Sequence, residues 1–199
     1  LVHSRTALLD LFLTFFVLLA VYLWHQQRHW LAAIAIGLAM GSKWSAVYFL
    51  VAMLFVSLYR IFSKHPSKEL VRPTIMKFVQ YGFLPVFVYI TSWTGWFLSN
   101  RGWDRQWSSN SFTSWIHYHS EMLGFHTGLT EKHSYQANPW SWMVMGRPTS
   151  FFYESPKGCG SDNCAQEVLA MGTPLLWWAG TIAVAVAIGF WLRALVMRS

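Results

Sequence analysis

Long apolar stretches alternate with short polar ones along the 199 residues of the chain. A helix needs about 20 mostly apolar residues to cross the hydrocarbon core of a membrane. Five stretches approach that length, from Leu8 to Trp24, Trp30 to Met40, Trp44 to Phe62, Ile75 to Leu98 (with Pro85 as a kink) and Pro174 to Leu192. The pattern predicts an all-α, polytopic transmembrane helical bundle with about five spans.

This pattern divides the chain into three parts. Residues 1–98 hold about four spans, residues 99–172 form a long aromatic-rich loop, and residues 173–199 hold the last span and a polar end. The second span is short, but it is rich in small residues, which suits close packing between helices. They are Ala32, Ala33, Ala35, Gly37, Ala39 and Gly41. We expect this span to cross, because otherwise every later segment would invert.

Composition argues against a soluble domain and against a nucleic-acid-binding protein. Hydrophobic residues make up 54% of the chain and charged residues 12%, about half the charged content of a soluble domain. The net charge is +7, yet the basic residues lie between apolar stretches and form no single stripe, so nucleic-acid binding is not expected. The chain opens at Leu1 without Met and ends at Ser199, and we expect it to be part of a longer protein.

The basic residues also predict an orientation in the membrane. Residues 25–29, 60–77 and 193–199 would lie on one side, and they hold eight basic residues against one acid, Glu69. The loop 99–172 holds five basic residues and six acids. Since short cytoplasmic segments are rich in Lys and Arg, this predicts a multi-pass protein of the plasma membrane with the long loop extracytoplasmic.

Cys159 and Cys164 enclose a short turn-forming segment, Cys-Gly-Ser-Asp-Asn-Cys. A small disulfide loop in an oxidising compartment is the favoured interpretation. Free thiols and a metal site are the alternatives. A zinc site needs four ligands, and no His or further Cys lies nearby in the sequence.

The long loop contains a helical pattern between Phe112 and Phe125. Its apolar positions recur at three- and four-residue spacing, at Phe112, Trp115, Ile116, His119, Met122 and Leu123. This predicts an amphipathic helix on the outer membrane surface. The alternative is a helix that covers a small core formed by the loop itself.

Further along, the loop places aromatic rings beside polar groups. These residues are His133, Tyr135, Gln136, Asn138, Trp140 and Arg147. Such mixtures can bind sugars, with rings against the apolar sugar face, but membrane-interface anchoring uses the same residue types.

Three ionisable residues fall at the outer ends of spans: Arg5, Asp10 and Lys43. A basic group at that depth can bind the phosphate of a lipid carrier, Arg through two hydrogen bonds and Lys as a point charge. Alternatively, Arg5 pairs with Asp10 and Lys43 extends to the interface.

Four segments resemble a known family. They are His-Ser-Arg-Thr-Ala-Leu-Leu-Asp (3–10), Gly-Leu-Ala-Met-Gly-Ser-Lys-Trp-Ser (37–45), His-Ser-Tyr-Gln-Ala-Asn-Pro-Trp-Ser-Trp (133–142) and Gly-Arg-Pro-Thr-Ser-Phe-Phe-Tyr (146–153). In order and membrane setting they resemble the bacterial branch of the protein O-mannosyltransferases, and the resemblance covers nearly the whole chain. Eukaryotic relatives carry a β-trefoil domain in the corresponding loop, for which this loop is too short.

The resemblance implies a GT-C glycosyltransferase that moves mannose from a polyprenyl-phosphate-mannose donor to Ser or Thr hydroxyls of exported proteins. It implies donor-phosphate binding by Arg5, Lys43 and Arg147, and a sugar or acceptor surface at His133, Tyr135, Asn138 and Trp140. The expected partners are the lipid bilayer, the lipid-linked donor and the protein acceptors, with the secretion machinery as a further candidate. No metal-binding residue and no resident cofactor are assigned, and the sequence does not give the metal requirement.

Two departures and one gap accompany the resemblance. Ser134 stands where the family often has Pro, and Ala137 where it often has Ser. The family's catalytic Asp-Glu motif is expected upstream of Leu1, so no catalytic residue is assigned here. Asp10 is interpreted as a partner of Arg5, and Glu121 is a weak candidate for the base.

Three other functions are weighed beside this one. A GT-C transferase for another sugar or acceptor would have the same fold. A non-catalytic membrane relative is also open. A transporter is disfavoured, because the spans hold few ionisable groups and no symmetric repeat.

Overall fold

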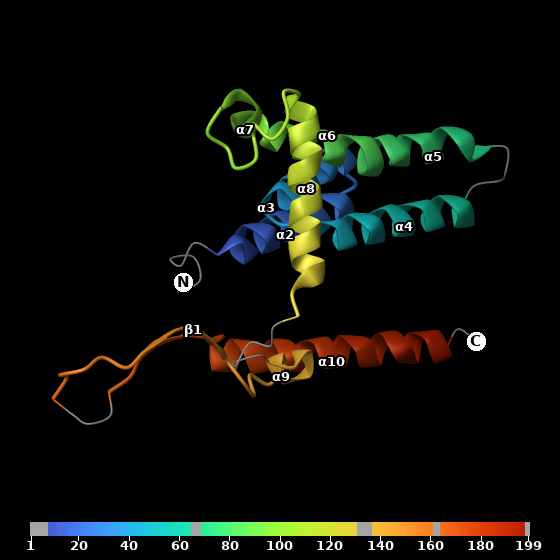
Figure 1. Cartoon of the computed structure of the whole chain (residues 1–199). Helices are drawn as coiled ribbons and strands as arrows, with labels where there is room; N and C mark the ends of the chain where they lie inside the picture. The colour runs from blue at the N-terminus through green and yellow to red at the C-terminus, as the bar shows by residue number, and fades with distance from the viewer. Residues whose placement is uncertain (1–7, 65–68, 131–136, 161–163, 198–199) are drawn as a thin grey trace. The chain divides into compact units, whose positions relative to one another are not determined.

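The computed structural model describes residues 8–64, 69–130, 137–160 and 164–197 (Figure 1). The chain forms two units, residues Leu1–Gly128 and Leu129–Ser199, and each is described here by itself. In the first unit the helices are α2 (Leu9–His25), α3 (His29–Ser42), α4 (Ala46–Lys64), α5 (Val71–Phe78), a π-helical turn η2 (Val79–Phe83), α6 (Leu84–Ser92), α7 (Thr94–Leu98) and α8 (Ser111–Gly128). The second unit holds α9 (Pro139–Trp142), β1 (Thr149–Glu154), β2 (Gln166–Ala170) and α10 (Pro174–Val196).

Helix α3 is the central helix of the first unit. It packs against α2 on one side and α6 on the other, and most of its small residues are buried, as the sequence predicted. A Cβ atom added to Gly37 would lie 2.7 Å from Cβ of Val88 and 2.9 Å from the carbonyl oxygen of Pro85. Only glycine therefore allows α3 and α6 to approach this closely.

The fourth apolar stretch is helical from Val71, four residues before the predicted start. The predicted disturbance at Pro85 takes the form of the turn η2, in which the N–H of Leu84 donates to the carbonyl of Val79, five residues back. Proline has no N–H and its ring crowds the carbonyl four residues earlier, so a locally wider helix accommodates it. The helix then breaks at Trp93 before α7.

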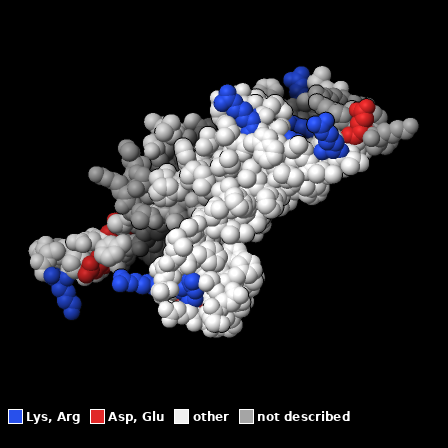
Figure 2. All heavy atoms as spheres, turned by 90° about the horizontal axis from the view of Figure 1, so that it is seen from above, with Lys and Arg blue, Asp and Glu red and all other residues white. Residues whose placement is uncertain are grey.

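The structure is an all-α polytopic membrane protein. Within the described residues, three segments are long and apolar enough to cross a membrane: Ala46–Ser63, Val71–Ser92 and Pro174–Val196. Helices α2 and α3 are apolar but shorter, at 17 and 14 residues. At 1.5 Å per residue α3 is roughly 21 Å long, less than the hydrocarbon core, so its crossing stays a prediction. Figure 2 shows a broad surface of uncharged residues on which basic and acidic side chains appear in a few small groups.

Helix α8 contains the predicted amphipathic segment. Its apolar residues do not all behave alike, because Trp115 and His119 pack against rings of the bundle while Ile116 and Leu123 are exposed. The helix therefore covers the aromatic end of its own unit, and an interfacial position stays a prediction.

The sequence pattern did not predict the strands of the second unit. Strands β1 and β2 pair antiparallel, with an irregularity between Ser150 and Phe152. Helix α10 follows, and none of its described residues is buried within the chain, although nearly all are apolar. An apolar helix of 23 residues that is exposed along its length suits a lipid environment.

Candidate functional site

One end of the first unit carries an ion pair where α2 begins and α3 ends. The Lys43 ammonium lies 2.7 Å from a carboxylate oxygen of Asp10, and the two side chains are 45% and 59% exposed. Lys43 follows the last turn of α3 in an extended conformation, and Asp10 stands in the first turn of α2, where the helix dipole favours an acid. An exposed pair of this kind contributes only about 0–1 kcal/mol to stability.

The next residue, Trp44, begins a chain of hydrogen bonds that links the turn between α3 and α4 to helices α6 and α8. Its indole Nε1 donates to the hydroxyl oxygen of Tyr89 on α6 over 2.9 Å. That hydroxyl lies 2.5 Å from Nε2 of His119 on α8. Nδ1 of His119 lies 2.7 Å from the backbone carbonyl of Trp115.

These distances define the tautomer of His119. A carbonyl can only accept, so Nδ1 carries the hydrogen, and Nε2 then accepts from the Tyr89 hydroxyl. Burial lowers the pKa of His119, against the smaller effect of the Trp115 carbonyl, which raises it. The neutral ring at pH 7 fits this role, and the network fastens the turn after Lys43 to α6 and α8.

Aromatic rings surround this network. Trp93 makes edge-to-face contacts with Tyr89, Trp96, Trp115 and Tyr118. Edge-to-face pairs place the positive edge of one ring on the negative face of another and add about 0.5–1.5 kcal/mol each beyond burial.

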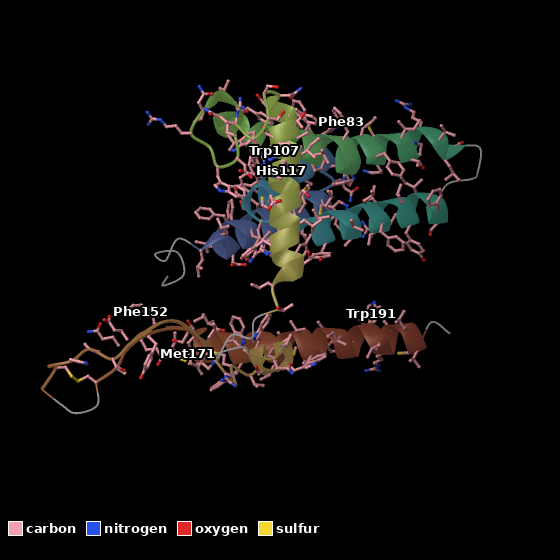
Figure 3. All side chains as sticks on the ribbon, in the orientation of Figure 1. Phe83, Trp107, His117, Phe152, Met171 and Trp191 are labelled. Carbon is pink, nitrogen blue, oxygen red and sulfur yellow. A yellow bond between two sulfur atoms is a disulfide. The ribbon has the colours of Figure 1, made fainter. Side chains whose placement is uncertain are left out.

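The segment between α7 and α8 closes over the same rings. A guanidinium nitrogen of Arg105 donates to the carbonyl of Phe97 over 3.1 Å, and the guanidinium carbon lies 5.3 Å from the Trp96 ring centre. The Trp107 ring stacks on that of His117 at 4.0 Å between centres (Figure 3). These contacts hold the loop residues 99–110 onto the end of the unit.

In the second unit, the segment Asn-Pro-Trp-Ser-Trp forms the short helix α9. Asn138 is its N-cap, and the side-chain oxygen accepts from the backbone N–H of Trp140 over 3.1 Å. Pro139 occupies the first helical position, where the missing N–H costs nothing. The Trp140 side chain is 80% exposed.

The turn after α9 is fastened to the start of α10 by three side-chain donors. Trp177 donates to the carbonyl of Trp142 over 2.5 Å, and Trp178 to that of Val144 over 3.2 Å. Thr181 donates to the carbonyl of Met143 over 2.7 Å. The carbonyls of three consecutive residues at and after the end of α9 therefore accept hydrogen bonds from α10.

Two sequence-predicted features follow this turn. Arg147 is exposed between α9 and β1. Cys159 and Cys164 form a disulfide in the connection between β1 and β2, with 6.5 Å between their Cα atoms. No group of three or more His, Cys, Asp or Glu side chains placed to hold a metal occurs among the described residues.

Comparison with known protein families shows to which family the chain belongs. The family described as dolichyl-phosphate-mannose-protein mannosyltransferase matches residues 1–125, more than half of the chain. The chain belongs to this family. The C-terminal four-transmembrane region of protein O-mannosyltransferase matches residues 111–199, so family similarity runs from one end of the chain to the other.

Curated relatives in this family are polyprenol-phosphate-mannose–protein mannosyltransferases. The Corynebacterium glutamicum protein is 28% identical over 238 aligned positions, which cover 89% of this chain and 45% of the relative. The Mycobacterium tuberculosis protein is 27% identical, covering 94% of this chain and 46% of the relative. The chain thus spans about half the length of these relatives, and the 238 positions exceed its 199 residues, so they carry insertions. No solved structure matches the chain.

Within this family framework, the structure distributes the predicted site residues unevenly. Lys43 lies in the first unit, while Asn138, Trp140 and Arg147 lie in the second. Arg5, His133 and Tyr135 lie outside the described residues. Asp10 pairs with Lys43, while the expected pairing of Asp10 with Arg5 involves a residue outside the described ones and stays a prediction.

The sequence did not reveal the link between Trp44, Tyr89 and His119. His119 was grouped with apolar residues because it follows their spacing on α8. The sequence does show a histidine, His119, among the apolar positions of this helix. That pattern suggests a buried histidine, but it does not identify the residue to which the histidine is hydrogen-bonded.

Proposed function

We propose that the chain is part of a membrane protein O-mannosyltransferase, which moves mannose from polyprenyl-phosphate-mannose to Ser or Thr hydroxyls of exported proteins. The main support for this proposal is the match to the family, which covers the chain from residue 1 to residue 199. The names of the curated relatives specify a polyprenol-phosphate-mannose donor and a protein acceptor.

The orientation proposed places the Lys43–Asp10 end outside the cell. The basic segment around residues 60–77 then lies in the cytoplasm, as short loops of membrane proteins favour. The disulfide between Cys159 and Cys164 supports an extracytoplasmic loop, because such bonds persist in oxidising compartments.

Lys43 is proposed to contact the donor phosphate. Its ammonium lies at the end of an apolar helix, where a lipid phosphate would lie, and its one described ion pair is exposed and weak. The donor can therefore compete with Asp10 for this charge. Arg5 and Arg147 are proposed as further phosphate contacts by family resemblance.

The second unit is proposed to supply the sugar or acceptor surface. The exposed Trp140 ring can stack on a sugar, and the Asn138 oxygen that caps α9 leaves the amide nitrogen available as a donor. His133 and Tyr135 complete the proposed set by resemblance.

A carboxylate must accept the hydroxyl proton as the acceptor attacks the anomeric carbon, and positive charge must stabilise the departing phosphate. Lys43 can serve the second requirement. Asp10 is paired with Lys43, so we assign the first requirement to the family's Asp-Glu motif and not to Asp10 or Glu121.

The test is transfer by the purified full-length protein from polyprenyl-phosphate-mannose to a Ser/Thr peptide. Lys43→Met should raise the donor KM by roughly tenfold to hundredfold, because the variant loses one charge-assisted hydrogen bond to the donor phosphate. Lys43→Arg should retain much of the activity, and Lys157→Met, an exposed lysine on the β1–β2 connection, should match wild type.

Three outcomes would contradict the proposal. Normal kinetics of Lys43→Met would remove the phosphate role. Preference for polyprenyl-phosphate-glucose over the mannose donor would indicate a different transferase. Absence of transfer by wild-type protein with both donors would indicate a non-catalytic relative.

A further inference from the structure

The end of the first unit opposite the Lys43–Asp10 pair contains a polar cavity of about 250 Å³. Helix α2 ends there and α3 begins there, one helix length away from the ion pair. The cavity is lined by Trp24, Gln27, His29, Ser57, Arg60, Ile61 and Lys77. Its residues come from α2, α3, α4, α5 and the turn before α3, so tertiary packing creates it.

The charged groups of this cavity are all basic. The Arg60 guanidinium lies over the Trp24 ring, 4.5 Å from its centre. The Lys77 ammonium donates to the side-chain oxygen of Gln80 over 3.0 Å. Over the described part of the chain, no carboxylate lines the cavity and no ion pair engages Arg60 or Lys77. Two positive charges thus face a small space without compensation.

Hydrogen bonds hold the walls in place. Trp24 donates to the Ser57 hydroxyl over 3.0 Å, and Ser57 is only 4% exposed. His29 contacts the Tyr81 hydroxyl through Nδ1 at 2.8 Å and the side-chain oxygen of Gln27 through Nε2 at 3.2 Å. The amide oxygen can only accept, so Nε2 carries the hydrogen.

The backbone at Gln27 turns the chain between α2 and α3. Its φ is 61°, in the left-handed region, and it directly follows the C-cap of α2, where this conformation is common. The N–H groups of Gln27 and Arg28 donate to the carbonyls of Trp24 and Leu23 and so close the helix end. Here the conformation brings the Gln27 side chain to His29 at the cavity rim.

An apolar groove of about 520 Å³ shares two helices with the cavity. On α3 its Trp30 follows His29 of the cavity, and on α5 its Met76 precedes Lys77 of the cavity. Its lining is Trp30, Glu69, Val71, Arg72, Ile75, Met76 and Val79. A basic cavity next to an apolar groove matches a molecule with an anionic head and a hydrocarbon tail.

We propose that this cavity binds the phosphate headgroup of an anionic phospholipid, with an acyl chain along the neighbouring groove. Basic pockets between transmembrane helices recognise anionic headgroups in this way. The two cations supply charge, the amide nitrogen of Gln27 supplies a neutral donor while His29 binds the Gln27 oxygen, and the volume accommodates a phosphate ester. The site is separate from the proposed donor-phosphate contact at Lys43.

The test measures lipid retention by the purified full-length protein with native mass spectrometry, after exposure to phosphatidylglycerol and phosphatidylcholine. Wild type should retain phosphatidylglycerol preferentially. Arg60→Gln and Lys77→Gln should each weaken its retention about fivefold, the contribution of one basic residue near an anionic headgroup. Arg28→Gln removes an exposed arginine at the same end that does not line the cavity, and its retention should match wild type.

Equal retention of the two lipids by wild type would overturn the proposal. Equal losses in Arg28→Gln and Arg60→Gln would overturn it also, because diffuse surface charge would then explain binding. Displacement of phosphatidylglycerol by glycerol phosphate or inorganic phosphate at equal concentration would show a site for free phosphate. If a variant fails to fold, the preference of wild type for phosphatidylglycerol must still fall with rising sodium chloride.

Discussion

Replacing Tyr89 with Phe removes one oxygen atom from the hydrogen-bond network at the Lys43 end of the first unit. The hydroxyl accepts from Trp44 and donates to His119, so its removal leaves one donor and one acceptor without partners. The Tyr89 ring itself is buried and its packing contacts survive in Phe. The substitution therefore isolates the hydrogen bonds.

The expected loss in the free energy of unfolding depends on how exposed Trp44 and His119 are. A fully buried unsatisfied group costs about 1–3 kcal/mol. Trp44 and His119 are only partly buried, so we take the lower end for each and expect a loss of about 2 kcal/mol in the free energy of unfolding. In a protein of this size that corresponds to a fall of about 4–8 °C in Tm.

The assay is thermal unfolding in detergent, followed by tryptophan fluorescence. Tyr118→Phe is the matched control, because Tyr118 lies in the same ring cluster and no described hydrogen bond involves its hydroxyl. It should leave Tm nearly unchanged. The double variant of Tyr89→Phe with Trp44→Phe should lose less than the sum of the two single losses, because donor and acceptor then disappear together.

Equal falls in Tm for Tyr89→Phe and Tyr118→Phe would contradict the network, since ring packing would then account for both. Strict additivity in the double variant would contradict the bond between Trp44 and Tyr89. The same substitution should also affect donor binding. Because Trp44 directly follows Lys43, Tyr89→Phe should also raise the donor KM of the full-length protein.

Three further predictions follow from the structure. Gly37→Ala should destabilise the bundle by about 1–3 kcal/mol in unfolding, because the added Cβ overlaps Val88, whereas Gly124→Ala, in open space on α8, should be neutral or stabilising. The folded-state pKa of His119 is lowered, so the unfolded chain takes up its proton first. Stability from this group is complete above pH 6.5 and should fall as pH drops below it, and His119→Gln should reduce that slope in acid titrations of Tm. Thr181→Val should cost about 1 kcal/mol locally and raise hydrogen exchange in the turn after α9, with unchanged exchange there contradicting the bond to Met143.

Apolar periodicity was sufficient for the helices. Each predicted span coincides with a helix or a helical segment, although the fourth breaks at Trp93, because apolar length and polar interruption are local properties of the chain. The hairpin β1–β2 was missed because its residues are mostly exposed and give no alternation of buried and exposed positions. Cys159 and Cys164 were recognised because a disulfide across five residues depends on local spacing.

The partners of the polar groups could not be read from the sequence. Lys43 and Asp10 are 33 residues apart, and Trp44 and Tyr89 are 45 apart. Each pair forms because α3 packs against both α2 and α6. The small residues of α3 allow this packing, but their pattern in the sequence does not show which polar side chains it brings together. Tryptophan and tyrosine also count as apolar in a periodicity, although one polar atom on each decides the contact.

The two ends of the same bundle differ in how their charge is compensated, and this difference separates their proposed roles. At one end Lys43 has an acid within 2.7 Å, so an incoming phosphate must displace Asp10 and can leave again when Asp10 returns. At the other end the described contacts of Arg60 and Lys77 are with aromatic rings and an amide oxygen, so among the described residues no carboxylate competes with a bound anion. A substrate site requires exchange, whereas a structural lipid is retained. The paired end therefore suits the lipid-linked donor that turns over, and the unpaired end suits a phospholipid that stays.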